Sequence, residues 1–151
     1  MEYTKNDIKK IGLSCLNLNL RRTGRLVTNY YDMMLKDSGL RITQFTVLLS
    51  ITYGKDLSIT ELAKITDIDR TTLQRSLKIL ERDKLIKIEK KDTGNVNRLS
   101  LTSRGESKLA TGIQLWKIAQ DSMKRSLGSA EFENTLKMLV QVRKVTLNRK
   151  V

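Results

Sequence analysis

The stretch from Leu57 to Thr102 constrains the fold most strongly. It reads as a short helix, a tight turn, a second helix with a polar outer face, and two alternating strands joined by a glycine-containing turn. Those elements in that order are typical of a winged helix-turn-helix, which places its second helix in the major groove of DNA. We therefore predict a mainly α (α+β) chain with a winged helix-turn-helix lobe over residues 42–102.

The two helices of this motif have recognisable starts. Ser58 precedes Glu61 by three residues, which is the spacing of a capping box, and Asp69 is suited to cap the second helix. The link 66–68 has the length of a helix-turn-helix corner. Helical spacing predicts that the following residues point inward: Leu62, Ala63 and Ile65 on the first helix, and Leu73, Leu77 and Leu80 on the second.

The opposite face of the second helix holds the candidate DNA-reading residues. Gln74 can pair with an adenine edge, Arg75 can fork onto guanine, and a threonine can touch a thymine methyl group or a phosphate. The plainer alternative is a solvated face of an amphipathic helix. The residues predicted to bind DNA here are Arg70, Thr71, Thr72, Gln74, Arg75 and Lys78.

The hairpin that follows is predicted to supply phosphate contacts. Ile86 and Ile88 alternate with charged residues, residues 92–95 have turn chemistry, and residues 97–101 alternate again. In a winged helix such strands approach the DNA backbone, although a solvated surface hairpin would show the same pattern. The candidate contacts are Lys87, Lys90, Lys91, Asn95 and Arg98.

The segments on either side are predicted to be helical. Thr4 with Asp7 three residues on is a candidate capping start, and apolar residues at helical spacing favour one long helix from there to about Lys36. Thr43 is expected to cap an apolar core helix ending near Gly54. After the hairpin, we expect a helix with a packing seam, a break at Gly128, and a last helix. The chain, 1–151, is then one domain in which residues 1–40 and 103–151 pair as a dimerisation layer.

The amino-acid composition limits the classes of function that the chain can have. Lysine and arginine total 29 against 16 acidic residues, a net charge of +13 that suggests an anionic partner, although residues 60–91 carry a surplus of only three. Without histidine, and with one cysteine, the chain has no evident catalytic set or metal site. We expect no cofactor and no enzyme activity. No apolar run reaches membrane-spanning length and the start does not resemble a signal peptide, which predicts a cytoplasmic protein without a membrane partner.

Four further residues are candidates for an effector response. Cys15 is either a small core residue or a redox-active thiol. Tyr30, Tyr31 and Trp116 are either core residues or the lining of a pocket for an aromatic ligand.

The chain resembles the multiple-antibiotic-resistance regulator (MarR) family of transcription factors. The similarity covers almost the whole chain, and its most specific parts are DRTTLQRSL and the exit from the hairpin, RLSLTSRG. The residues that carry it are NLRRTGRLVTNYYD (19–32), GLRITQFTVL (39–48), SITELAKITDIDRTTLQRSLKILERDKLI (58–86), LSLTSRGE (99–106) and LWKIAQ (115–120).

The resemblance implies a homodimer that binds a pseudo-palindromic operator in double-stranded DNA. Most members are repressors, released by a small lipophilic ligand or an oxidant. Members usually carry a wing-tip arginine after an aspartate, whereas Asp92 here is followed by Thr93, so the wing is expected to bind phosphates chiefly. Zinc-sensing relatives use histidines, which are absent. Peroxide-sensing relatives use a cysteine with nearby tyrosines, a branch that Cys15 permits.

Two other classes stay open at this point. A winged helix can serve protein or RNA contact without duplex specificity, in which case the polar face of the second helix would have no DNA to read. An enzyme acting on nucleic acid ranks last, because no catalytic set is visible.

Overall fold

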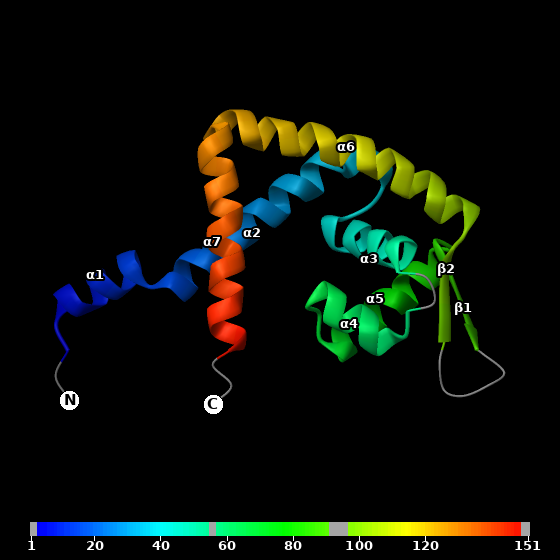
Figure 1. Ribbon diagram of the computed structural model, residues 1–151, viewed down its shortest axis with the longest axis horizontal. Coiled ribbons are helices and arrows are strands. Elements are labelled where there is room, and N and C mark those ends of the chain that lie inside the picture. The colour runs from blue at the N-terminus through cyan, green and yellow to red at the C-terminus, as the bar shows by residue number, and fades with distance from the viewer. Residues whose placement is uncertain (1–2, 55–56, 91–96, 149–151) are drawn as a thin grey trace.

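The computed structural model describes residues 3–54, 57–90 and 97–148, which are mainly helical with one small antiparallel sheet (Figure 1). The predicted fold class, a winged helix-turn-helix between terminal helices, is confirmed. The elements are α1 (Lys5–Ser14), α2 (Leu16–Met34), the 3-10 turn η1 (Lys36–Ser38), α3 (Ile42–Tyr53), α4 (Ile59–Thr66), α5 (Arg70–Arg82), β1 (Ile86–Lys90), β2 (Asn97–Leu101), α6 (Ser103–Leu127) and α7 (Ser129–Leu147).

The prediction of one uninterrupted N-terminal helix is wrong. The helix breaks at Cys15, whose backbone is extended (φ −70°, ψ 111°) between α1 and α2. The side-chain amide of Asn19 donates to the carbonyls of Leu13 at 3.2 Å and Cys15 at 3.0 Å, so these groups at the break keep partners. Apolar spacing does not reveal the break, because leucines recur with helical spacing on both sides of it.

The junction between α2 and α3 also differs from its prediction. Gly39, which ends the 3-10 turn, adopts the left-handed conformation (φ 67°). Thr43, however, does not cap α3, which begins at Ile42. Asp32 on α2 accepts a hydrogen bond from the backbone N–H of Ile42 at 2.7 Å and therefore takes over the capping role from a distance. The start of α3 is thereby tied to α2.

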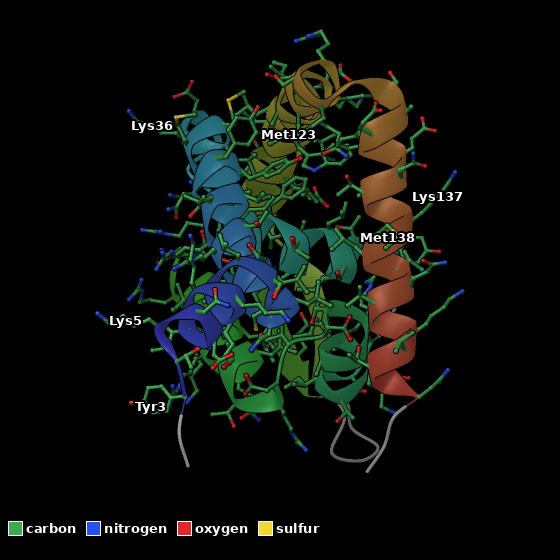
Figure 2. The ribbon with its side chains drawn as sticks, turned by 90° about the vertical axis from the view of Figure 1, so that its left-hand side faces the viewer. Tyr3, Lys5, Lys36, Met123, Lys137 and Met138 are labelled. Atoms are coloured by element: carbon green, nitrogen blue, oxygen red, sulfur yellow. The ribbon has the colours of Figure 1, made fainter. Side chains whose placement is uncertain are left out.

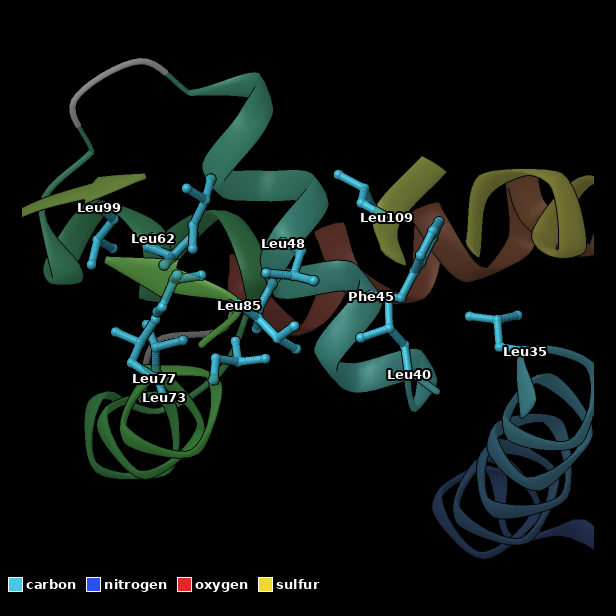
Figure 3. Packing of buried hydrophobic residues seen from close by; sticks show 14 residues of the cluster. Leu35, Leu40, Phe45, Leu48, Leu62, Leu73, Leu77, Leu85, Leu99 and Leu109 are labelled. Carbon is cyan, nitrogen blue, oxygen red and sulfur yellow. The ribbon is translucent and has the colours of Figure 1, made fainter. Parts of the chain in front are cut away.

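The hydrophobic core lies where α3, α4 and α5 meet the hairpin and the first turns of α6 (Figure 3). Leu48, Leu62 and Leu73 are fully buried there. Ile65, which was predicted to point inward, is 52% exposed, so that prediction is wrong. Leu49, on the helix predicted to be an apolar core helix, is 43% exposed. Each residue lies on the side of its helix that faces away from the core.

The hairpin is joined tightly to α6. β1 and β2 pair antiparallel with Ile86 opposite Leu101 and Ile88 opposite Leu99, as alternation predicts. Thr102 caps α6 by accepting from the N–H of Gly105 at 3.0 Å, and its hydroxyl donates to the carbonyl of Lys84 at 2.7 Å. The first turn of α6 therefore rests on the turn between α5 and β1.

The terminal helices surround the lobe without being buried in it. α6 runs across the lobe, and α7 turns down from it at Gly128 (φ 87°) (Figure 1). Along α6, Leu109 is buried in the core, whereas Leu127 near the end of the helix is 48% exposed. None of the residues that form α1, α2 and α7 is buried. Lys5 on α1 and Lys137 on α7 project away from the ribbon (Figure 2). Within the described ranges, each helix is too short or too polar to cross a membrane.

Candidate nucleic-acid interface

The second helix of the motif, α5, separates a buried side from an exposed side. Leu73, Leu77 and Leu80 are at most 1% exposed and anchor the helix in the core, as predicted. The opposite side is in solvent along the whole helix. The six residues predicted to bind DNA from it, Arg70, Thr71, Thr72, Gln74, Arg75 and Lys78, are all exposed. Their role in binding stays a prediction, but the structure places them on one accessible surface.

The N-terminus of α5 is capped by an acidic side chain. Asp69 accepts from the N–H of Thr72 at 2.9 Å, as predicted. Hydrogen bonds from Thr72 hold the pKa of Asp69 below its usual range, with a smaller contribution from the nearby charge of Arg75. Asp69 is therefore ionised at neutral pH. The N-terminus of this helix thus carries a negative charge that opposes the approach of a phosphate, while Arg75, about one and a half turns further on, supplies a positive one.

The register of the two strands determines which side chains lie together on the outer face of the hairpin. Lys87, Glu89 and Arg98 are exposed, and Glu89 lies directly opposite Arg98, an arrangement of opposite charges that favours the pairing of the strands. Lys90 belongs to β1 by its backbone. Lys91 and Asn95, with the rest of the turn, lie outside the described residues. The surface of the wing that the structure describes is thus of mixed charge.

The structure does not bring the four effector candidates together. Tyr30 donates to the carbonyl of Ala119 at 3.2 Å, Tyr31 donates to the side chain of Gln120, and the two rings meet edge to face at 5.4 Å. Cys15 precedes Tyr30 by 15 positions, which places it about 22 Å away along α2. Burial raises the pKa of Tyr31, with a smaller contribution from Tyr30.

These tyrosines join α2 to α6 through their hydrogen bonds, and their role toward a ligand stays a prediction. Trp116 packs against the core, and Cys15 is half-buried at the break between helices. A cleft of about 610 Å³ lies elsewhere, between α3, β2 and α6, with Ile51, Arg98 and Ile113 in its lining. Among the described residues, no group of three or more acidic or cysteine side chains is placed to hold a metal ion.

Sequence reasoning missed one contact close to α5. Arg143 on α7 places its Nη1 atom 4.0 Å from Oδ2 of Asp67, in the corner between α4 and α5. The basic composition of the C-terminal segment was visible in the sequence, but its target was not, because the two residues are 76 positions apart.

Comparison with known proteins connects this geometry to a family. The transcriptional regulator MosR of M. tuberculosis is 30% identical, with 89% of this chain and 98% of MosR covered and a TM-score of 0.75. A sequence model described as MarR family matches residues 38–94, the part that holds the helix-turn-helix. The chain belongs to the MarR family of transcriptional regulators.

Other structures extend the comparison within the MarR fold. MosR of M. tuberculosis in complex with DNA is 27% identical over 91% of this chain and all of that chain, with a TM-score of 0.82. The transcriptional repressor CouR, bound to a 23-mer DNA duplex, is 23% identical over 95% of this chain and 99% of its own, with a TM-score of 0.80. That identity shows a shared fold. No curated protein matches the chain.

Proposed function

We propose that this chain is a cytoplasmic DNA-binding transcriptional regulator, and specifically a repressor, that inserts α5 into the major groove of its operator. The observation that carries the proposal is the division of α5 into a fully buried leucine face and an exposed polar face. Such a helix is held rigidly by one side while the other is free to meet base edges. MosR and CouR, which share the fold, were each crystallised with DNA.

We further propose that the regulator is a homodimer, with residues 42–102 as the DNA-binding lobe and residues 1–40 and 103–151 as the dimerisation region. The support is apolar surface: a groove of about 400 Å³ between α2 and α7 is lined by Leu16, Leu20, Met138, Leu139 and Val142, among others. Ile8 and Ile11 on α1 are also exposed. Exposed apolar surface that is contiguous commonly marks an interface, and a second copy presents the same surface under a two-fold axis.

Two copies explain how a lobe with little surplus charge can bind DNA firmly. Each lobe would read one half of a pseudo-palindromic operator, so the two sets of contacts act together. Release by a small molecule or an oxidant would follow from a change in the spacing of the lobes. The alternative that Cys15 senses organic peroxide is tested by measuring the operator affinity of wild type and Cys15→Ser after hydroperoxide treatment. An equal response of both would leave Cys15 a structural residue.

The proposal is tested by DNA selection. Purified protein is used to select genomic fragments, and the affinity for a recovered duplex is compared between wild type and Arg75→Ala. We expect Arg75→Ala to weaken binding by about 1–3 kcal/mol if the guanidinium reads a guanine. Arg82→Ala is the matched control, because Arg82 lies in the last turn of the same helix, where its Nε donates to Asp83 at 3.0 Å.

The outcomes separate the candidate functions. Unchanged affinity in Arg75→Ala would remove the role assigned to that side chain. Failure of the wild-type protein to retain any duplex would contradict DNA binding itself, and would favour a winged-helix module that contacts protein or RNA.

A further inference from the structure

The corner before α5 carries more negative charge than a DNA-binding surface can easily accommodate. Asp67 ends α4 in the left-handed conformation (φ 52°), and Asp69 caps α5 two residues later. Both side chains are exposed. If α5 enters the major groove by its N-terminal turns, these two acids approach the phosphate backbone, and each would repel it at distances within the screening length of about 8 Å at physiological salt.

The C-terminal half of α7 has the opposite charge. From residue 134 to the end, the sequence contains no acidic residue and five basic ones, which are Lys137, Arg143, Lys144, Arg149 and Lys150. α7 runs down from the end of α6 until its C-terminal end lies level with α4 (Figure 1). Its basic end is therefore on the same side of the molecule as the helix-turn-helix corner.

Arg143 connects the two features. Its Nη1 atom lies 4.0 Å from Oδ2 of Asp67, and both side chains stay largely in solvent, at 63% and 71% exposed. An ion pair in such a position adds little to folding stability, because water screens it and both side chains lose freedom. The pair has a different effect when DNA is near. Asp67, paired with Arg143, then no longer presents a free negative charge to the phosphates.

We propose that Arg143 is a DNA-affinity residue that neutralises Asp67, making the end of α7 part of the DNA-binding surface. The inference rests on the proposed function, since it concerns how the same surface meets DNA. Under this proposal, Arg143 of the terminal helices contributes to DNA binding by the lobe. Asp69 is not affected, because its partner is the N–H of Thr72.

The test is a double-mutant cycle read by DNA affinity. The dissociation constant for a fluorescein-labelled duplex recovered by the genomic selection is measured for wild type, Arg143→Ala, Asp67→Asn and the double variant. We expect Arg143→Ala to weaken binding about 3- to 10-fold, the order of one water-exposed charge within the screening length of the backbone. In the Asp67→Asn background, the same substitution should change affinity less than about two-fold, because the acid to be neutralised is gone.

Two further variants control for charge and for folding. Arg143→Lys keeps the charge and should retain wild-type affinity within about two-fold, whereas Lys137→Ala removes a basic residue of α7 from outside the contact and should have little effect. Thermal unfolding of each variant should match wild type, because the pair is exposed.

The outcomes are distinct. Equal losses from Arg143→Ala in both backgrounds would overturn the proposal, because Arg143 would then contact DNA independently of Asp67. No loss in either background would overturn it as well. Both results presuppose that wild type binds the duplex and that Arg75→Ala weakens it, so a failure of DNA binding itself is recognised separately.

Discussion

Single residues decide how the lobe is joined to the helices around it, and Gly105 shows this most directly. A Cβ atom built on Gly105 would lie 2.0 Å from the carbonyl oxygen of Leu85, which is closer than any real contact. The same carbonyl accepts from the N–H of Thr102 at 3.0 Å. The first turn of α6 thus approaches the backbone before β1 so closely that only glycine fits.

We expect Gly105→Ala to reduce the free energy of unfolding by about 1–3 kcal/mol, because the backbone must shift to admit one methyl group. Chemical denaturation measures the change. Ser107→Ala is the control, because Ser107 is exposed on the same helix and its replacement should fall within about 0.5 kcal/mol of wild type. Equal stability of Gly105→Ala and wild type would contradict the close approach.

Residue roles were predictable from the sequence where they depend on near neighbours. The leucines of α5 and the exposed row opposite them follow from helical spacing alone. The need for glycine at position 105 and the pairing of Arg143 with Asp67 were not, because each depends on a segment distant along the chain. The base contacts of Gln74 and Arg75 stay predictions until DNA is bound.

The starts of the helices show the same distinction between near and distant neighbours along the chain. The caps at Ser58 and Asp69 were predictable because each side chain bonds within its own first turn. The break at Cys15 and the start of α3 were not, because Asn19 and Asp32 satisfy backbone groups from elsewhere. Local capping chemistry is readable from sequence, whereas capping by a distant side chain requires the fold.

Three acidic caps give the folding stability a defined dependence on pH. Hydrogen bonds from Thr4, Ser58 and Thr72 hold the pKa values of Asp7, Glu61 and Asp69 below those of the free side chains, 3.8 for aspartate and 4.5 for glutamate. Because the folded pKa is the lower one, the stabilisation is complete above these values. It is lost as the pH falls through the folded pKa values.

We therefore expect the unfolding temperature to fall as the pH is lowered from 4.5, the ordinary glutamate value, through the lower folded pKa of Glu61. Glu61→Gln should lower the unfolding temperature at neutral pH. It should also make the fall in unfolding temperature at acid pH smaller, because the capping box with Ser58 then holds no carboxylate to protonate. Scanning calorimetry at a series of pH values measures both. An identical acid loss in wild type and Glu61→Gln would show that this carboxylate does not contribute.

At the scale of the whole molecule, buried apolar side chains are distributed unevenly between the lobe and the terminal helices. The lobe has its own core, whereas the surfaces of α1, α2 and α7 leave many large apolar side chains in water. The sequence predicted terminal helices that pair, because their apolar residues exceed what a small lobe can cover. It did not predict that α7 descends beside the lobe, since no periodicity records the angle between two helices.

Met138 and Lys137 test the dimer with neighbouring residues on α7 (Figure 2). Met138 lines the groove between α2 and α7 and is 58% exposed, so Met138→Glu places a charge in the proposed interface. We expect sedimentation equilibrium to give twice the 17.3 kDa chain mass for wild type and a shift toward the chain mass for Met138→Glu. Lys137→Glu should remain dimeric. A monomeric wild type would contradict the dimer.

The proposed dimer places two α5 helices on one operator. Nuclease footprinting on a fragment recovered by genomic selection tests this arrangement. We expect two symmetric protected half-sites whose centres lie about 10 base pairs, or a multiple of that, apart on one face of the duplex. Both should weaken together in Arg75→Ala. Binding of two α5 helices to one operator would be contradicted if the wild-type protein retained a duplex but protected no sequence in it. Protection of a single half-site by wild type would contradict it as well.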